Sequence, residues 1–440
     1  MLPLLLILLY LRYILIYLFF LSSNNSKVVN KVDNFLKKDD LILIDKDNKN
    51  FKLDKEFLEW FVGFTDAEGN FSITLRDKPA KKPNNLLDSL KNKKSQENTV
   101  PKYVNLTFQI GLHINDLNTL IYIKEKLKTG NISISKERCN YYVSDFKSII
   151  HIIIPIFNFF LLNSSKYSQF LTFKQAATII YDKTHLINVG FSKLLYLRNN
   201  IYENPNSPNL IRITDNWLLG FIEGDATFST LKLRPRLKFE CHVKEERLFL
   251  SIRDYLDVGK VVKTVRYRKK SNKSEYSVIL DIWDIYFLKL ILVPLLISLD
   301  FHTNKYLDFC NWCYITNLYY WGYHLISEGK ELIIEIKSYM NKSRLVNFNK
   351  KINYDEVKLK VTNLFNVPSP YVIKNTKRVK RFDGKMLNLE VIVLNTIDNN
   401  EFRYHSINEA ACALRISRKK IRSLLGTGIV YKNYIFNESH

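Results

Sequence analysis

Two segments of this chain are versions of one another: Phe61-Val62-Gly63-Phe64-Thr65-Asp66-Ala67-Glu68-Gly69 and Leu218-Leu219-Gly220-Phe221-Ile222-Glu223-Gly224-Asp225-Ala226. Each is an apolar stretch in which two small residues stand four positions apart, Gly63 and Ala67 in the first and Gly220 and Gly224 in the second. This spacing places the small residues on one face of a helix. We therefore expect the two helices to pack backbone against backbone along these faces.

An acidic residue follows each pair of small residues, Glu68 in the first segment and Asp225 in the second. The expected packing brings these carboxylates together at the C-terminal ends of the two helices, where anions are disfavoured and like charges repel each other. A divalent cation relieves both costs, and carboxylate oxygens are ligands that suit Mg²⁺. The sequence therefore predicts that Glu68 and Asp225 bind Mg²⁺.

The repeat extends well beyond these two segments. Pro155 is followed eleven residues later by Lys166-Tyr167-Ser168-Gln169-Phe170, and Pro294 is followed at the same distance by Lys305-Tyr306-Leu307-Asp308-Phe309. The acidic residue precedes the lysine by 98 residues in the first half (166 − 68) and by 80 in the second (305 − 225). Residues 78–100, which are rich in Lys and Asn and have no apolar period, are predicted to be an inserted loop that explains the difference.

The duplicated residues resemble the paired motif of the LAGLIDADG homing endonucleases and their maturase relatives, in the form that carries both motifs in one chain. The resemblance covers about residues 53–345. It implies an α+β fold of two pseudo-symmetric αββαββα halves, residues 51–200 and 210–345, each with an antiparallel sheet that forms one side of a saddle over DNA. Such a chain is expected to act as a monomer on double-stranded DNA.

The pattern of the first half agrees with a mixed α+β fold. Asp54 is predicted to cap a helix over residues 55–67, and Gly69 is expected to end it in a left-handed conformation. Strict alternation of apolar and polar residues follows, as in a half-buried strand, and a two-stranded ribbon is narrow enough to enter the major groove. The predicted DNA face of this strand is Asn70, Ser72, Thr74 and Arg76.

The second half is predicted to run as a helix over 214–224, strands over 227–233 and 237–243, a helix over 245–256 and a hairpin of 260–268 with 276–281. Alternation fails in its first strand, because placing Phe228 in the core would also bury Lys232. A bulge near Thr230 or an early end of the strand is therefore needed. Four cations around the hairpin tip are expected to meet phosphates, which position a protein without specifying sequence: Arg266, Arg268, Lys269 and Lys270.

The resemblance also implies roles for residues around the paired carboxylates. In the family, a lysine at the positions of Lys166 and Lys305 lies near the scissile phosphates, and a glutamine in the second strand organises water. Gln109 matches that glutamine. Glu240 is assigned to the same place in the second half, which makes the two halves chemically unequal.

Two further features of the motif bear on its chemistry. Asp66 and Glu223 occupy its earlier acidic position and are expected to cap or pair at the helix interface. Ala226 replaces the glycine that usually ends the motif. A left-handed conformation there would cost alanine about 1 kcal/mol more than glycine and displace Asp225 slightly.

The chain beyond the duplicated core is predicted to hold a basic linker, residues 346–388, and a separate module, residues 389–440. In the module a strand over 389–396 precedes two short helices with capping serines, which look like a helix-turn-helix. The segment also resembles the modular DNA-binding domain associated with homing nucleases. Its second helix carries basic residues expected to bind DNA: Arg418, Lys419 and Arg422.

The composition indicates a polyanionic partner and an organellar origin. The net charge of +23 implies nucleic acid or an anionic membrane surface. The abundant Lys, Asn, Ile, Leu, Tyr and Phe can all be written with AT-rich codons, which favours a mitochondrial genome. Within the N-terminal segment, residues 1–50, residues 2–21 hold one charge and are long enough to cross a bilayer. They are either a membrane anchor or a remnant of an upstream exon.

The sequence therefore predicts a mitochondrial, Mg²⁺-dependent endonuclease that cuts both strands of an intron insertion site and so spreads its own intron. The alternative is a maturase that helps its group I intron RNA to fold, with or without nuclease activity. A membrane-anchored structural protein is a third possibility, which rests only on residues 2–21.

Overall fold

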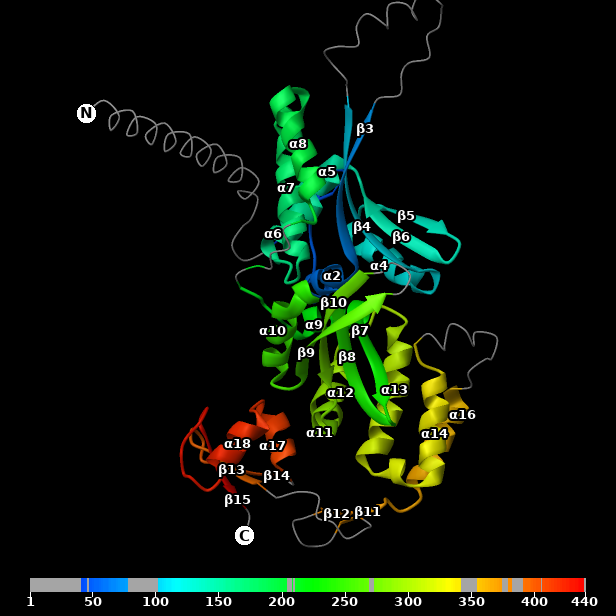
Figure 1. Ribbon diagram of the computed structural model, residues 1–440, viewed down its shortest axis with the longest axis vertical. Helices are drawn as coiled ribbons and strands as arrows, with labels where there is room; N and C mark the ends of the chain where they lie inside the picture. The colour runs from blue at the N-terminus through cyan, green and yellow to red at the C-terminus, as the bar shows by residue number, and fades with distance from the viewer. Residues whose placement is uncertain are drawn as a thin grey trace, which may run out of the picture. The chain divides into compact units, whose positions relative to one another are not determined.

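The computed structural model describes residues 41–45, 47–77, 102–203, 208, 210–268, 273–341, 354–373, 379–381, 391–404 and 406–438. The chain divides into two compact units, Met1–Pro208 and Asn209–His440 (Figure 1). The predicted N-terminal segment 2–21, the inserted loop 78–100, Lys269 and Lys270 lie outside the described residues. Among the residues that are described, no helix combines the length and the apolar character needed to span a bilayer.

The first unit has a short β1–β2 hairpin (Ile42–Ile44 and Asn50–Lys52) followed by the predicted half. Its elements are α2 (Lys55–Glu68), β3 (Gly69–Asp77), β4 (Lys102–His113), α4 (Leu117–Leu127), β5 (Asn131–Ser135), β6 (Arg138–Val143), α5 (Phe146–Ser148), α6 (Ile154–Phe159), α7 (Lys166–Tyr181) and α8 (Asn188–Asn200). The strands form an antiparallel sheet in the order β3-β4-β6-β5.

The second unit repeats this arrangement. Its elements are α9 (Asp215–Asp225), β7 (Ala226–Leu231), β8 (Arg234–His242), α10 (Glu246–Leu256), β9 (Lys260–Arg268), β10 (Lys273–Ile282), α11 (Ile285–Phe287), α12 (Val293–Ile297), α13 (Lys305–Tyr320) and α14 (Ser327–Ser338). The sheet order β7-β8-β10-β9 matches that of the first half. The predicted α+β fold of two αββαββα halves with antiparallel sheets is confirmed.

Both halves absorb a proline in the same way. A π-helical turn, Ile149–Ile153 in the first half and Leu288–Leu292 in the second, precedes a short helix that holds Pro155 or Pro294 in its first turn. The residues on both sides of each π-helical turn are helical, so each proline lies inside a continuous helical segment. Proline removes a helical hydrogen bond, and the π-helical turn is a local change of helix geometry beside it. The shared detail shows that the duplication extends to local backbone geometry.

The end of each motif helix differs from the prediction. Gly69 and Ala226 both have extended backbone, with φ of −70° and −88°, so each helix passes directly into a strand. The expected left-handed conformation is wrong at both positions, and Ala226 carries no strain of that kind. Position 69 requires glycine for a steric reason instead. A Cβ there would lie 2.4 Å from Cγ2 and 2.8 Å from the carbonyl oxygen of Thr65.

Strand β7 ends early, which resolves the failed alternation of the second half. The strand stops at Leu231, and Lys232 and Leu233 form a two-residue turn with φ of 47° and 67° before Arg234 begins β8. Turns with both central residues at positive φ match the twist of a β-hairpin. Phe228 is fully buried while Leu231 is 57% exposed, as the shorter strand requires.

The tail is more structured than the predicted linker. Helix α16 (Tyr354–Phe365) lies within residues 346–388 and buries Val357, Val361 and Leu364. Lys360 on this helix forms an ion pair of 2.8 Å with Glu335 on α14. A short strand pair follows, β11 (Tyr371–Ile373) with β12 (Val379–Arg381).

The C-terminal module has its own small core. Its strands β14 (Glu401–Tyr404), β13 (Val391–Asn395) and β15 (Tyr434–Glu438) form one sheet against α17 (Ile407–Leu414) and α18 (Arg418–Leu424). Ser406 caps α17 and Ser417 caps α18, as predicted.

Candidate active site and nucleic-acid interface

The two predicted metal ligands occupy equivalent positions. Glu68 is the last residue of α2 and Asp225 the last residue of α9. The Oδ2 atom of Asp225 accepts a hydrogen bond of 3.3 Å from the thiol of Cys241. Each half thus offers one carboxylate at the end of its motif helix, a donor type that fits a hard cation such as Mg²⁺. The packing of the small-residue faces and the pairing of Glu68 with Asp225 stay predictions.

The two lysines of the repeat contact the helix ends that carry these carboxylates. Lys166 donates from Nζ to the carbonyl oxygens of Thr65, at 3.2 Å, and of Ala67. Lys305 donates to the carbonyl oxygens of Gly224, at 3.2 Å, and of Ala226. A cation at this place offsets the partial negative charge of the helix end. Lys305 thus contacts the residues on both sides of Asp225, whereas Lys166 contacts residues one and three positions before Glu68. Ala67 and Gly224 are the equivalent acceptors in the two halves.

The earlier acidic residue of each motif accepts hydrogen bonds from the backbone just before the helix that begins with the lysine. Asp66 accepts hydrogen bonds of 2.8 Å from the backbone N–H groups of Asn163 and Ser164, just before α7. Its side chain is buried, with 3% of its surface exposed. Asp66 therefore binds the backbone just before the helix that begins at Lys166, and its predicted role at the interface of the two motif helices stays a prediction.

Glu223 makes the corresponding contacts in the second half. Its Oε1 atom accepts from the backbone N–H of His302, at 2.9 Å, and from the N–H and Oγ1 of Thr303, at 2.6 and 2.7 Å. Helix α13 then begins at Lys305. The same chain of contacts, from motif carboxylate to helix start to lysine, therefore occurs twice.

Strand register corrects one sequence assignment. Gln109 pairs with Asn70, two residues after Glu68, and Lys238 pairs with Thr227, two residues after Asp225. Glu240 therefore does not occupy the place of Gln109; Lys238 does.

Two further marks give the same correspondence. Gln109 precedes the capping residue His113 by four positions, and Lys238 precedes His242, which caps the equivalent turn, by four. On the other side of each strand, Gln109 pairs with Tyr142 and Lys238 pairs with Asp281. Tyr142 and Asp281 each stand three residues before the aspartate that caps the next helix.

The predicted alternation of β3 is seen at Asn70, Ser72 and Thr74, and the contact of this face with DNA stays a prediction. Phe71 is fully buried and Ile73 is 6% exposed, whereas Asn70, Ser72 and Thr74 are half-buried. Asn70 accepts a 3.1 Å hydrogen bond from the hydroxyl of Tyr202. Arg76 lies in β3, and Arg266 and Arg268 lie in β9.

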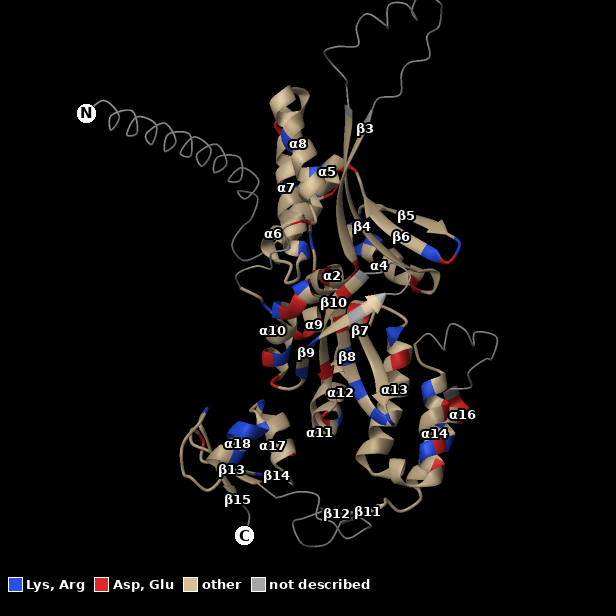
Figure 2. Ribbon diagram, in the orientation of Figure 1, with Lys and Arg blue, Asp and Glu red and all other residues tan. Residues whose placement is uncertain are grey.

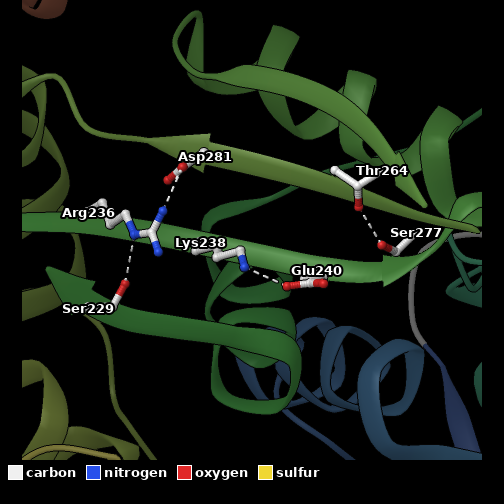
Figure 3. A network of polar contacts seen from close by, with 7 residues as sticks. All are labelled: Ser229, Arg236, Lys238, Glu240, Thr264, Ser277 and Asp281. Carbon is white, nitrogen blue, oxygen red and sulfur yellow. Dashed lines mark hydrogen bonds and ion pairs between the residues drawn. The ribbon is translucent and has the colours of Figure 1, made fainter. Parts of the chain in front are cut away.

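The corresponding face of the second sheet carries a charged network (Figure 3). Arg236 forms an ion pair of 3.0 Å with Asp281, and Lys238 is paired with Glu240 on the same strand. Thr264 and Ser277 are joined across β9 and β10 at 2.7 Å. Arg236, Lys238, Glu240 and Ser277 border a hollow of about 720 Å³ that also reaches Asp225. The proposed metal ligand and these residues of the network therefore share one concave surface.

The basic helix of the C-terminal module is partly engaged within its own unit. Lys and Arg gather on α18 (Figure 2), and Lys419 and Arg422 are exposed. Arg418 instead forms an ion pair of 3.1 Å with Asp284, the residue that caps α11. Two of the three predicted DNA-binding residues of this helix therefore point outward, and the third attaches the module to the second half.

Comparison with known proteins agrees with this geometry. Residues 61–177 and 218–316 match the family model of the LAGLIDADG endonuclease. The chain is 24% identical over 425 residues to the uncharacterized mitochondrial protein RF1 of Saccharomyces cerevisiae, covering 89% of this chain and 84% of that one. It is 27% identical to the probable intron-encoded endonuclease 3 of Neurospora crassa, over 61% of this chain and 51% of that protein.

Solved structures show the same fold. The LAGLIDADG homing endonuclease I-GzeII in complex with its DNA target superposes with a TM-score of 0.52 and 27% identity, over 65% of this chain and 99% of that one. I-SmaMI bound to uncleaved DNA matches with a TM-score of 0.52 and 21% identity, over 64% and 98%. The family match spans both motif regions, and both halves repeat the fold and place a lysine against the carbonyls at the end of the motif helix. This chain belongs to the LAGLIDADG endonuclease family.

Proposed function

We propose that this protein is a homing endonuclease that makes a Mg²⁺-dependent double-strand cut in DNA at the insertion site of its intron. The observation that carries the proposal is the duplicated helix end. In both halves a motif carboxylate accepts from the backbone just before a helix, and the first lysine of that helix donates to main-chain carbonyls at the end of the motif helix. The nuclease activity follows from the family. The metal, the cut site and the residue roles are our inference.

In this mechanism Glu68 and Asp225 would hold the metal. When bound there, Mg²⁺ supplies Lewis-acid polarisation of the phosphate and an activated water. Lys166 and Lys305, whose ammonium groups donate to carbonyls at the ends of the two motif helices, would stabilise negative charge on the phosphate. Gln109 orients a water in the first half, and Lys238 presents a cation at the equivalent place in the second half.

The proposal is tested with a linear DNA that carries the uninterrupted exon junction. Incubation with the full chain and Mg²⁺ should give two fragments, and the same DNA interrupted by the intron should stay intact. Chelation of the metal should stop the reaction. An uncut junction under all conditions, together with tight binding of the intron RNA, would favour the maturase alternative instead.

The cellular site is proposed to be the mitochondrion. RF1 of Saccharomyces cerevisiae is described as mitochondrial, and the matching proteins of Neurospora crassa are described as probable intron-encoded endonucleases. The AT-rich codon usage expected from the composition agrees with this location.

A further inference from the structure

The solvent-facing sides of the two sheets differ in chemistry at matched positions. Given the register of Gln109 with Lys238, Thr107 corresponds to Arg236 and Asn105 to Arg234. The first half therefore presents an amide, a hydroxyl and an amide along β4, where β8 of the second half presents three cations. The two halves share one fold, but the side chains that could hydrogen-bond to the edge of a base differ between them.

Arg236 is held in one orientation by two neighbours. Its Nε donates to Oγ of Ser229 at 3.2 Å, and its Nη1 donates to Oδ2 of Asp281 at 3.0 Å. The side chain is 21% exposed, and that of Asp281 17%. Figure 3 shows the guanidinium lying between the strands that carry these two partners.

These hydrogen bonds leave part of the guanidinium available. An arginine has five N–H groups in a rigid, planar fork, and two of those of Arg236 donate within the sheet. The other three have no acceptor among the residues that the structure describes, and they are enough for a pair of parallel hydrogen bonds. Because the side chain is already ordered, little rotamer entropy is lost when it binds.

The carboxylate beside it changes what Arg236 is suited to bind. A cation that serves phosphates is most effective without a compensating anion, whereas Arg236 is neutralised by Asp281 at 3.0 Å. What Arg236 can bind therefore depends more on the direction of its N–H groups than on its net charge. Arginine pairs with O6 and N7 of guanine through two such bonds, and this pattern distinguishes guanine from the other bases in the major groove.

We propose that Arg236 recognises a guanine in the half of the DNA target bound by the second half of the protein, with Asp281 and Ser229 as positioning residues. This inference rests on the proposed function, because it requires the face of β7, β8 and β10 to contact DNA. It adds the identity of a base and of the residue that selects it.

The test selects DNA bound by the full chain from a pool of random duplexes, with calcium in place of magnesium to prevent cutting. The wild-type protein should enrich a consensus that contains a fixed guanine in one half-site. Arg236→Thr, which installs the residue of the first half, should lose that one preference and keep the other positions. Measured on single duplexes, the wild type should discriminate guanine from other bases at this position by roughly ten- to a hundred-fold.

Matched variants separate recognition from general binding. Arg234→Gln removes an arginine from the same strand whose Nε donates to the carbonyl oxygen of Trp283, and it should leave the guanine preference unchanged. Asp281→Asn should weaken the preference while the protein still melts cooperatively. Arg236→Gln should shift the selected base towards adenine, to which glutamine can donate and accept.

The inference is overturned if Arg236→Thr and the wild type select the same consensus, or if Arg234→Gln alters the same position as strongly. If the wild type enriches no sequence at all, the proposed endonuclease function fails instead. The two failures are therefore distinguishable.

Discussion

Glu68 and Asp225 are the residues on which the proposed chemistry depends most directly. Changing Glu68 to Gln, or Asp225 to Asn, removes a metal-binding charge and keeps the shape of the side chain. Each variant should lower the cutting rate by more than the roughly 10–100-fold that is typical for outer partners of a metal site. DNA affinity should change little.

Cleavage of the exon-junction DNA under single-turnover conditions measures the first effect and fluorescence anisotropy the second. Glu125→Gln, the same kind of change at an exposed position of α4, serves as the control and should cut at the wild-type rate. A variant of either acidic residue that cuts at the wild-type rate would remove it from the site.

The capping carboxylate of Asp66 is predicted to control both stability and the rate of cutting. Asp66→Ala leaves the buried N–H groups of Asn163 and Ser164 without an acceptor, so the free energy of unfolding should fall by about 2–4 kcal/mol. The start of α7 should loosen, and cutting should slow because Lys166 is no longer held. Urea denaturation and single-turnover cleavage measure the two effects.

A conservative change distinguishes positioning from simple stabilisation. Asp66→Asn keeps one acceptor oxygen and should recover part of both losses. The opposite result, an Asp66→Ala protein that is less stable yet cuts at the wild-type rate at low temperature, would limit Asp66 to a structural role.

At the scale of the element, helix α2 depends on a cap that titrates. Asp54 accepts from the backbone N–H of Phe57 at 2.7 Å and pairs with Lys126 at 2.7 Å. Partial burial raises the pKa of Asp54, but the hydrogen bonds from Lys126 and Phe57 outweigh it and hold the pKa below its ordinary value. A carboxyl whose pKa is lowered by folding stabilises the protein at pH values above its pKa in the unfolded chain, about 3.9. This stabilisation is lost as the pH falls through the pKa of the same group in the folded protein.

We therefore expect Asp54→Asn to flatten the loss of stability below about pH 4. Because Asp54 is 44% exposed, the effect should be small, and because asparagine is also a good cap, stability at neutral pH should change only by loss of the ion pair. Thermal melts of both proteins across this pH range measure the difference. Equal acid dependence would show that other carboxylates dominate.

Elements with a local signal can be predicted from the sequence, and those fixed by spacing between strands cannot. The motif helices, the cap at Asp54 and the hairpin of β9 with β10 follow from apolar period and capping residues. Lys-Phe-Glu looks like Thr-Phe-Gln, which matches Glu240 to Gln109, but strand pairing moves the correspondence by two residues to Lys238. The face of the sheet stays the same after such a shift, so alternation cannot reveal it.

Other residues have a weak signal or a misleading one. Helix α16 is hidden in a basic segment, although Val357, Val361 and Leu364 stand at helical spacing and are buried. Gly69 ends a helix, which usually indicates a left-handed residue, yet it serves close approach to Thr65. The pairing of Arg236 with Asp281 joins residues 45 apart in sequence, and only the fold brings them together.

At the scale of the whole molecule, the C-terminal module is predicted to add affinity and not chemistry. Removing everything after Pro370 deletes α17 and α18, and retains α16 and the hydrogen bond of 2.7 Å from Tyr323 to the carbonyl of Val367. DNA binding should weaken, and the slope of log affinity against log salt should fall by about 0.9 for each phosphate that the shortened protein no longer binds. Cutting at saturating protein should persist.

A charge variant checks that the effect comes from α18. The double change Lys419→Gln and Arg422→Gln alters two exposed cations and leaves the ion pair of Arg418 with Asp284 in place. It should reproduce part of the decrease in salt dependence. If the shortened protein keeps its full affinity and salt slope, the module has another task.

The hydrogen bonds of Asp66 and Glu223 have a consequence for how the gene can be arranged. Asp66 joins its motif helix to a helix start 98 residues later, and Glu223 does so 80 residues later, each within one compact unit. Each half therefore makes these hydrogen bonds with its own residues. Two separate polypeptides, one ending at Pro208 and one beginning at Asn209, should each fold and together restore cutting when produced in the same cell. An ancestral gene that encoded a single half, acting as a pair of identical copies, could have been duplicated and fused into this chain without new hydrogen bonds of this kind.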